Sequence, residues 1–341
     1  MAKILVTGGT GYIGSHTVVE LQNAGFDVYI VDNLSNSEAK VVDRIKHITG
    51  IGPGFEQVDC VDYNALESVF KKNNGFDAVI NFAASKAVGE SVENPLLYYE
   101  NNLMILINIL KLMLKYGSTN LVFSSSCTVY GQPDILPVTE SAPIKPALSP
   151  YGNTKQICEE IIRDTITANS GLTSVVLRYF NPVGAHQSAE IGELPNGVPN
   201  NLLPFVAQTA IGKRSVLRVF GNDYDTPDGS CIRDYINVVD LAKAHVVSVQ
   251  RMLEKKNKSG FEVFNLGTGR GLTVLEIIKK FEEVNGVKVP FEIVGRREGD
   301  IEKVWADPTY ANTELGWKAE AGIEETLRTA WLWEQKINQT R

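Results

Sequence analysis

The chain opens with an apolar strand, a glycine-rich turn and an apolar helix, and this order limits the folds that it can adopt. Lys3–Thr7 reads KILVT, Gly8–Gly14 reads GGTGYIG, and apolar residues at helical spacing continue through Val18, Val19 and Leu21. Glycines at these places let the backbone turn tightly and approach a pyrophosphate, whose charge the start of a helix favours. The segment therefore predicts a dinucleotide-binding strand–turn–helix unit.

A carboxylate at the end of the second expected strand indicates which dinucleotide is bound. Asp32 follows the strand at 26–31, about 20 residues beyond the last glycines, where the adenosine ribose hydroxyls are expected. A carboxylate there repels a 2′-phosphate, and no arginine occurs in the segment 33–37 that follows. We therefore predict NAD, and not NADP, as the cofactor.

Strands and helices continue to alternate up to about residue 180, which predicts a parallel sheet with helices on both faces. Further strands are expected at 55–58, 77–81, 120–123 and 172–177, with a long helix at about 94–116. The fold class is therefore α/β, a Rossmann-type doubly wound parallel sheet with a smaller mixed α/β substrate-binding domain. In such sheets ligands lie at the carboxyl ends of the strands.

The alternation becomes irregular after about residue 180, which suggests a second domain. Residues 1–180 are expected to form the NAD-binding Rossmann domain and residues 181–341 the smaller substrate-binding domain. The division is expected to be discontinuous, with segments near 234–285 returning to the first domain. Phe261–Leu266 reads as one such buried strand, and Thr273–Glu276 as the capping box of the next helix.

The segment SPYGNTK, Ser149–Lys155, places a phenol and an ammonium one turn apart at a helix start. Its Ser-Pro pair suits the N-cap and the first helical position, so Tyr151 and Lys155 face the same way. Lys155 and the positive end of the helix dipole both favour the phenolate, which makes the pair a candidate acid/base. Ser126, at the tip of the preceding strand, can hydrogen-bond the same substrate oxygen as Tyr151.

Composition and charge argue against several classes of function. The net charge of −7 is unlike a nucleic-acid surface or a polybasic membrane surface. No apolar run is long enough to span a bilayer and the N-terminus lacks signal-peptide features, so a cytoplasmic location is expected. The four cysteines are far apart and are expected to be reduced. Neither they nor the four histidines have metal-ligand spacing, so no metal site is predicted.

Longer motifs make the chain resemble a known family. They include TGGTGYIGSH, DNLSNS, FAASKAVGESV, FSSSCTVYG, SPYGNTK, LRYFNPVGAH, FGNDYDTPDGS, RDYINVVDLA and RREGD, spread over nearly its full length. The chain resembles the extended short-chain dehydrogenases/reductases, and within them the UDP-galactose 4-epimerases. The resemblance implies an NAD-dependent isomerase of galactose metabolism that forms a homodimer. Such an enzyme interconverts UDP-galactose and UDP-glucose through a transient 4-keto intermediate.

The resemblance also implies the residues of the site. The cofactor shell would be Gly8, Gly11, Tyr12, Ile13 and Gly14 at the turn, Asp32, Asn33, Leu34, Ser35, Asn36 and Ser37 at the ribose, Asp59 and Cys60 at the adenine, Phe82, Ala83, Ala84 and Lys86 near the pyrophosphate, and Asn101, Ser126, Tyr151, Lys155 and Phe180. The UDP-sugar would contact Lys86, Ser126, Tyr151, Asn181, Asn201, Leu202, Arg218, Phe220, Arg233, Arg297, Asp300 and Val304. Arginines suit a diphosphate because their planar fork binds two oxygens at once.

In the implied reaction Tyr151 takes the proton from the sugar O4 while a hydride leaves C4 for NAD. Ser126 positions O4, and Lys155 helps to hold the pKa of the phenol low. The keto sugar then turns over while its nucleotide stays anchored, so that the hydride returns to the opposite face.

Two positions depart from the family pattern. Ala84-Ser85 stand where Gly-Leu is usual, a change that we expect to alter the packing of cofactor or sugar slightly. Val304 stands where members restricted to UDP-glucose and UDP-galactose have a bulky Tyr. The smaller side chain predicts room for an N-acetyl group, so that UDP-GalNAc and UDP-GlcNAc are also accepted.

Two alternative functions stay open. A nucleotide-sugar 4,6-dehydratase or decarboxylase also uses NAD, Tyr151 and Lys155, but related dehydratases place Asp-Glu where this chain has Cys127-Thr128. A non-catalytic nucleotide-sensing protein on the same fold has no need of Tyr151 or Lys155, and both are present here.

Overall fold

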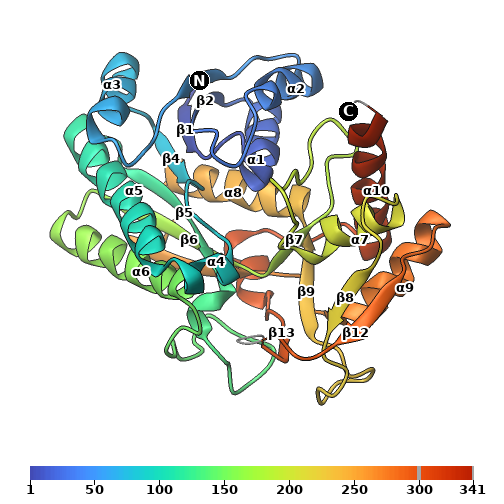
Figure 1. The fold of residues 1–341 in the computed structure, drawn as a ribbon. Coiled ribbons are helices and arrows are strands. Elements are labelled where there is room, and N and C mark those ends of the chain that lie inside the picture. Colours follow the sequence, from blue (N-terminus) through green and yellow to red (C-terminus); the bar gives the residue numbers. More distant parts are fainter. Residues whose placement is uncertain (298–300, 340–341) are drawn as a thin grey trace.

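The computed structural model describes residues 1–297 and 301–339, and its centre is a seven-stranded parallel sheet (Figure 1). The strands are β1 (Lys3–Thr7), β2 (Asp27–Asp32), β3 (Gly54–Gln57), β4 (Ala78–Asn81), β5 (Asn120–Ser126), β6 (Thr173–Tyr179) and β10 (Phe261–Leu266). Their order is β10-β6-β5-β4-β1-β2-β3, so the strand order reverses between β1 and β4. The carboxyl ends on either side of this reversal are where a doubly wound sheet binds its ligand.

Helices cover both faces of this sheet, because consecutive residues of its strands are apolar and point to opposite sides. In β1, Ile4 and Val6 belong to the core beneath α1 (Tyr12–Asn23), α2 (Lys40–Thr49) and α8 (Val238–Leu253). Leu5 belongs to the opposite core, beneath α3 (Tyr63–Asn73), α5 (Pro95–Tyr116) and α6 (Pro150–Ala168). The expected Rossmann-type α/β sheet is thereby confirmed, including the return of β10 to its edge.

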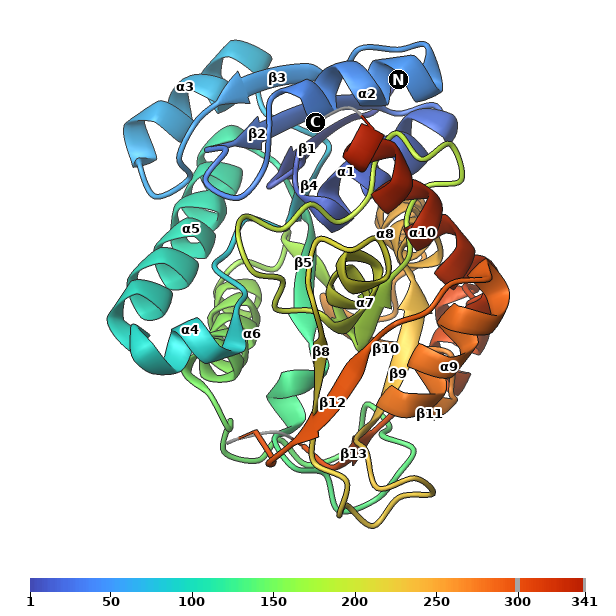
Figure 2. The same ribbon diagram turned by 45° about the vertical axis from the view of Figure 1, so that its right-hand side comes forward.

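The remaining elements form a smaller layer beside the sheet (Figure 2). β9 (Ile232–Asn237) pairs with β7 (Asn181–Val183), β11 (Gly271–Thr273) and β13 (Lys303–Val304), while β8 (Leu217–Phe220) pairs with β12 (Phe291–Val294). Around them lie α7 (Leu202–Ala210), α9 (Val274–Asn285) and α10 (Ile323–Gln339), which share one core. The chain also contains a 3-10 helix η1 (Cys127–Tyr130) and a π-helix η2 (Ala311–Leu315). The division at residue 180 stays a prediction.

Local details bear out several sequence signals and correct one. Ser149 caps α6 by accepting a hydrogen bond from the backbone nitrogen of Gly152, and the capping box that opens α9 at Thr273 is formed. The expected helix at 94–116 is α5, but a separate short helix α4 (Val88–Glu93) precedes it and was missed. Asn94 separates the two helices, and the following Pro95 begins α5 because proline is tolerated at a first helical position.

In the part of the chain that the structure describes, no helix is both long enough and apolar enough to cross a bilayer. Over the same residues, no group of three or more His, Cys, Asp or Glu side chains is arranged to hold a metal ion. Among the described residues no two of the four cysteines form a disulfide, and three of the cysteines are buried.

Candidate active site

At the glycine turn the backbone packs too closely to admit side chains. A Cβ at Gly14 would lie 2.2 Å from the carbonyl oxygen of Gly8, and Gly8 itself has a φ of +71°. A Cβ at Gly8 would lie 2.8 Å from the backbone nitrogen of Ala83. Gly11, the N-cap of α1, provides no side-chain cap for the first turn of this helix. The start of α1 can therefore receive an anion from outside the chain.

Asp32 ties the glycine turn to the loop after β2. Its Oδ2 accepts a hydrogen bond from the backbone nitrogen of Thr10 at 3.1 Å. Its Oδ1 accepts from the backbone nitrogen of Leu34 at 2.9 Å and from the Ser37 hydroxyl at 3.1 Å. A carboxylate can accept about four hydrogen bonds, so one position is left for a donor such as a ribose hydroxyl.

Asp59 and Cys60 lie next to this loop, after β3. Asp59 Oδ2 accepts from the Asn33 side chain at 3.1 Å, which joins the loops that follow β2 and β3. The Cys60 carbonyl oxygen accepts from Asn108 at 3.0 Å, and burial raises the pKa of its thiol. The Cys60 side chain is thus a buried neutral thiol, and only the backbone around it remains for contact with a ligand.

The loop after β4 carries the departure from the family pattern, Ala84-Ser85. The Ser85 hydroxyl accepts from Asn101 at 3.0 Å, while Asn102 accepts from the Ser85 nitrogen at 2.8 Å and donates to its carbonyl oxygen at 3.0 Å. Asn102 also donates to Thr154 of α6 at 3.1 Å. Only the hydrogen bond from Asn101 of α5 depends on the serine hydroxyl, because a leucine at position 85 could make the two backbone hydrogen bonds with Asn102 as well.

Tyr151, Lys155 and Ser126, called here the acid/base cluster, are all buried where β5 ends and α6 begins. The Lys155 ammonium donates to the Ser124 carbonyl oxygen at 2.7 Å. It lies 5.9 Å from the centre of the Tyr151 ring and 4.9 Å from that of Phe123. Burial lowers the pKa of Lys155 to about 8. An ammonium with this pKa exchanges its proton readily near neutrality.

The pKa of the Tyr151 phenol departs from expectation. Burial raises it well above the ordinary value, with a further increase from Tyr179, while a hydrogen bond with Ser126 opposes the shift. The sequence predicts a lowered pKa for this phenol, whereas its burial raises the pKa. A phenolate at Tyr151 therefore requires additional positive charge nearby.

Sequence reasoning missed two residues beneath the cluster, Ser124 and Tyr179. Their hydroxyls lie 2.6 Å apart, and Tyr179 pairs in register with Ser126 across β5 and β6. Ser124 and Ser126 are two residues apart on one strand and thus share a face. That spacing was a usable signal for Ser124, whereas Tyr179 depends on the register between two strands.

A cavity of about 1100 Å³ lies between the main sheet and the smaller layer. The predicted residues on its wall are Gly11, Tyr12, Asn36, Ser37, Lys86, Asn181, Asn201, Leu202, Arg218, Phe220, Arg233, Arg297 and Val304. Cys127, next to Ser126, and Ser149, two residues before Tyr151, are also on the wall. The predicted residues that do not line it are Gly8, Ile13, Gly14, Asp32, Asn33, Leu34, Ser35, Asp59, Cys60, Phe82, Ala83, Ala84, Asn101, Ser126, Tyr151, Lys155 and Phe180. Asp300 lies outside the described residues.

The predicted arginines differ in their surroundings. Arg233, on β9, donates to the carbonyl oxygens of Ile232 at 2.8 Å and Glu302 at 3.4 Å. Arg218 is paired with Glu292 at 3.2 Å on the exposed two-stranded sheet. Arg297 is exposed on the cavity wall. These three side chains place positive charge along one part of the cavity.

Val304 and Phe180 meet in one small apolar core. Both are buried, and Val304 also lines the large cavity. Its partner across the β13–β9 pair is Arg233. The size of residue 304 therefore affects the space beside that arginine.

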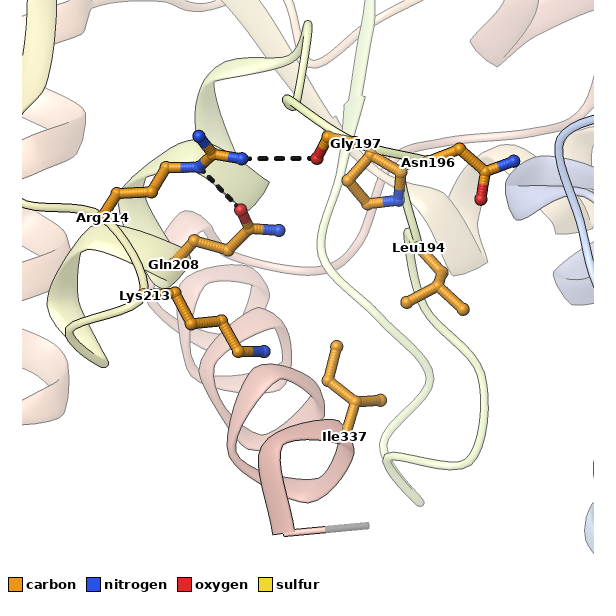
Figure 3. Close-up of a pocket in the computed structure, with 8 residues that line it drawn as sticks. Leu194, Asn196, Gly197, Gln208, Lys213, Arg214 and Ile337 are labelled. Atoms are coloured by element: carbon orange, nitrogen blue, oxygen red, sulfur yellow. Dashed lines mark hydrogen bonds between the residues drawn. The ribbon is translucent and has the colours of Figure 1, made fainter. Parts of the chain in front are cut away.

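A second, smaller cavity of about 350 Å³ adjoins the first and shares Leu194, Pro195, Asn196, Lys213 and Arg214 with it. Figure 3 shows the Arg214 side chain held by Gln208 and by the carbonyl oxygen of Gly197. Lys213 is paired with the buried carboxylate of Glu334 at 2.5 Å. Because these cations already have acceptors, this cavity does not offer free charge to a ligand.

Comparison with known proteins shows which sequences and structures this chain resembles. The family model described as GDP-mannose 4,6 dehydratase matches residues 5–330. UDP-glucose 4-epimerase of Bacillus subtilis is 52% identical over 97% of this chain and 96% of its own. The Stenotrophomonas maltophila UDP-glucose-4-epimerase, solved with bound NAD and formylated UDP-arabinopyranose, has a TM-score of 0.96 and 47% identity and covers 100% of both chains. The Bifidobacterium longum enzyme, in complex with NAD+ and UDP, has a TM-score of 0.95 and 47% identity over 99% of this chain and 100% of its own.

Proposed function

This chain belongs to the UDP-glucose 4-epimerase family, and on that premise we propose that it interconverts UDP-galactose and UDP-glucose by inverting C4, with NAD as its cofactor. The observation that carries the proposal is the acid/base cluster at the end of β5, beside an uncapped glycine turn and a cavity with arginines on its wall. Elimination by a dehydratase is disfavoured because Cys127-Thr128 follow Ser126, where related dehydratases carry acidic residues.

The residues present fit NAD. The uncapped start of α1, where Gly11 lines the cavity, suits the pyrophosphate. Asp32 keeps one acceptor position for a ribose hydroxyl, and Asn33 and Asp59 join the loops on the adenine side. When bound, NAD supplies the acceptor and donor of the hydride at the sugar C4.

Tyr151 and Ser126 handle the proton of the sugar O4. The Tyr151 phenolate accepts this proton as C4 is oxidised to the ketone and returns it when C4 is reduced again. Burial raises the pKa of the phenol, so the anion needs positive charge close by, and Lys155 is the cation that this chain provides. Ser126, whose hydrogen bond already favours the phenolate, holds O4 between them.

Inversion requires a fixed nucleotide and a mobile sugar. We assign the diphosphate to Arg233 and Arg297, because both are on the cavity wall and arginine binds phosphate oxygens in pairs. Phe220 and Arg218 of β8 are assigned to the uracil end. The 4-keto sugar is held by fewer groups. It can therefore rotate and present the opposite face of C4 to the hydride donor.

Val304 extends the proposal to N-acetylated sugars. Its side chain is much smaller than tyrosine and lies on the cavity wall beside Arg233. We propose that UDP-GalNAc and UDP-GlcNAc are substrates as well. Val304→Tyr should lower turnover of UDP-GlcNAc relative to UDP-glucose about tenfold or more, and an unchanged ratio in initial-rate assays would remove this part of the proposal.

Two further proposals concern the oligomeric state of the protein and its location in the cell. Leu96 and Leu97 at the start of α5 are exposed apolar side chains, and Met104 continues the same helix. A homodimer that covers them is consistent with these exposed residues, and the chain is proposed to act in the cytoplasm. Sedimentation equilibrium with Leu96→Glu and with the unmodified chain tests the dimer.

The function is tested by incubating purified protein with UDP-galactose and, separately, with UDP-GalNAc, without added reductant. NMR of the product should show the C4 epimer in each case. A 4-keto-6-deoxy sugar would instead establish a dehydratase. Absence of turnover by NAD-loaded protein would favour a nucleotide-sensing protein.

A further inference from the structure

The loop between β7 and α7, residues 184–201, lines the large cavity and is fixed by contacts with α10, with the loop after β2 and with the segment after α7. The indole nitrogen of Trp333 in α10 donates to the carbonyl oxygen of Glu193 at 2.9 Å. Asn196 donates to the carbonyl oxygen of Ser35 at 3.2 Å, and Arg214 donates to that of Gly197 at 3.3 Å (Figure 3). None of these three contacts uses the Glu193 side chain, so the loop has anchors that are independent of it.

The Glu193 carboxylate joins the two sides of the cavity. Its side chain is 13% exposed, and Oε1 accepts a hydrogen bond from the Asn201 amide at 2.5 Å. The same oxygen lies 3.7 Å from the Lys86 ammonium. Lys86 follows β4 of the main sheet, whereas Asn201 is the N-cap of α7 in the smaller layer. Both residues line the cavity with Glu193.

A carboxylate at this place determines what Asn201 offers to a ligand. An ionised carboxylate only accepts hydrogen bonds, so the NH2 group of Asn201 must face Glu193. The amide oxygen of Asn201 is then free to accept a hydrogen bond from a donor in the cavity. A UDP-sugar has such donors in the uracil N–H and the sugar hydroxyls.

The carboxylate also acts on Lys86. The Lys86 side chain is 48% exposed, and an unpaired lysine of that kind samples many rotamers. Attraction to a mostly buried carboxylate restricts the ammonium to the cavity, where its other donors can meet a ligand. Burial raises the pKa of Glu193, while Lys86 and Asn201 both oppose this increase.

We propose that Glu193 is a positioning residue for the sugar nucleotide: it orients the Asn201 amide so that its oxygen accepts from the UDP-sugar, and it holds Lys86 over the cavity. This inference rests on the proposed function and deepens it by adding a residue that does not itself touch the reacting atoms. Glu193 acts through two other side chains, so its loss should weaken binding of ground state and transition state alike.

The test compares Glu193→Ala and the isosteric Glu193→Gln with the control Glu190→Gln. Glu190 is on the same loop and pairs with Lys336 at 2.6 Å and with His47 at 3.7 Å. The probes are UDP, titrated by calorimetry, and UDP-galactose, for kcat and KM. Calorimetry with UDP measures binding without turnover and so does not depend on the reaction.

For Glu193→Ala we expect the Kd for UDP and the KM for UDP-galactose to rise about tenfold, with kcat changed less than about twofold. Glu193→Gln should show a smaller rise, about threefold, because glutamine still accepts from Asn201 but no longer attracts Lys86. Glu190→Gln should bind UDP like the unmodified chain.

The proposal is overturned if Kd and KM stay unchanged in Glu193→Ala, or if only kcat and the unfolding midpoint fall, which is the pattern of a structural role. Should the alanine variant not fold, unchanged UDP affinity in Glu193→Gln overturns it. Failure of the proposed function looks different: the unmodified chain would then bind UDP without inverting UDP-galactose, and the affinities of the variants would still decide the role of Glu193.

Discussion

The acid/base cluster and the arginines of the UDP-sugar side are held in place in different ways. Ser126, Tyr151 and Lys155 are at most 8% exposed and belong to β5 and α6, two elements of the main core. Arg218 and Arg297 are exposed, and Arg218 is paired with the exposed Glu292. Proton transfer depends on fixed geometry, which core packing provides. A flexible nucleotide can be bound by side chains that are held less firmly, by ion pairs that solvent screens.

The largest effect should come from Tyr151→Phe. This change removes the phenol oxygen and keeps the ring, so packing against the buried surroundings is preserved. We expect kcat for UDP-galactose to fall by roughly a thousandfold, within the range that general acid/base groups contribute. UDP affinity, measured by calorimetry, should change little. A variant that retained substantial turnover would place the proton transfer on another residue.

The second largest effect is expected from the buried ion pair beneath the cluster. Arg178 of β6 and Glu159 of α6 form a bidentate pair, and Ser125 of β5 donates to the same carboxylate. Arg178→Met leaves Glu159 charged and unpaired in the core, which should lower the free energy of unfolding by about 3–5 kcal/mol. Urea unfolding monitored by circular dichroism measures this. If the free energy of unfolding fell by less than about 1 kcal/mol, the core around the acid/base cluster would be no more tightly constrained than the surroundings of the exposed arginines.

These differences also explain what the sequence could reveal. The glycine turn, Asp32 and the Tyr151–Lys155 spacing are local patterns, so they could be predicted from neighbouring residues. Tyr179 depends on the register of β5 with β6, and Glu193 depends on a loop that brings residues 86, 193 and 201 together. No periodicity in the sequence specifies such contacts. The raised pKa of Tyr151 was not predicted for the same reason, because it results from burial, which is a property of the folded chain.

The third effect concerns pH. The pKa of Lys155 is lowered by burial from 10.5 to about 8, so the unfolded chain binds a proton at this site that the folded chain loses between about pH 8 and pH 10.5. Stability rises with pH wherever the unfolded state binds more protons. The destabilisation caused by burying Lys155 is thus complete below about pH 8 and disappears as the pH rises towards 10.5.

Lys155→Met isolates this contribution, since methionine does not titrate and other groups titrate equally in both proteins. The variant should gain stability relative to the unmodified chain below pH 8, by no more than about 3 kcal/mol. The gain should shrink on going to pH 10.5. Chemical unfolding at several pH values measures the difference, and a gain that stayed constant over this range would show that Lys155 is not destabilised by its burial.

The smallest effect is expected on the exposed side, at Glu292→Gln. Glu292 is half exposed and Arg218 is more exposed still, and exposed pairs of this kind contribute about 0–1 kcal/mol. Unfolding free energy should therefore change by less than about 1 kcal/mol, in contrast to Arg178→Met. Because the substitution releases Arg218 on the cavity wall, UDP affinity should be unchanged or slightly increased, most clearly at low salt where charges are less screened. A large loss of stability here would show that the two-stranded sheet of β8 and β12 is held by this pair, and the contrast between a packed catalytic side and a loosely paired nucleotide side would no longer hold.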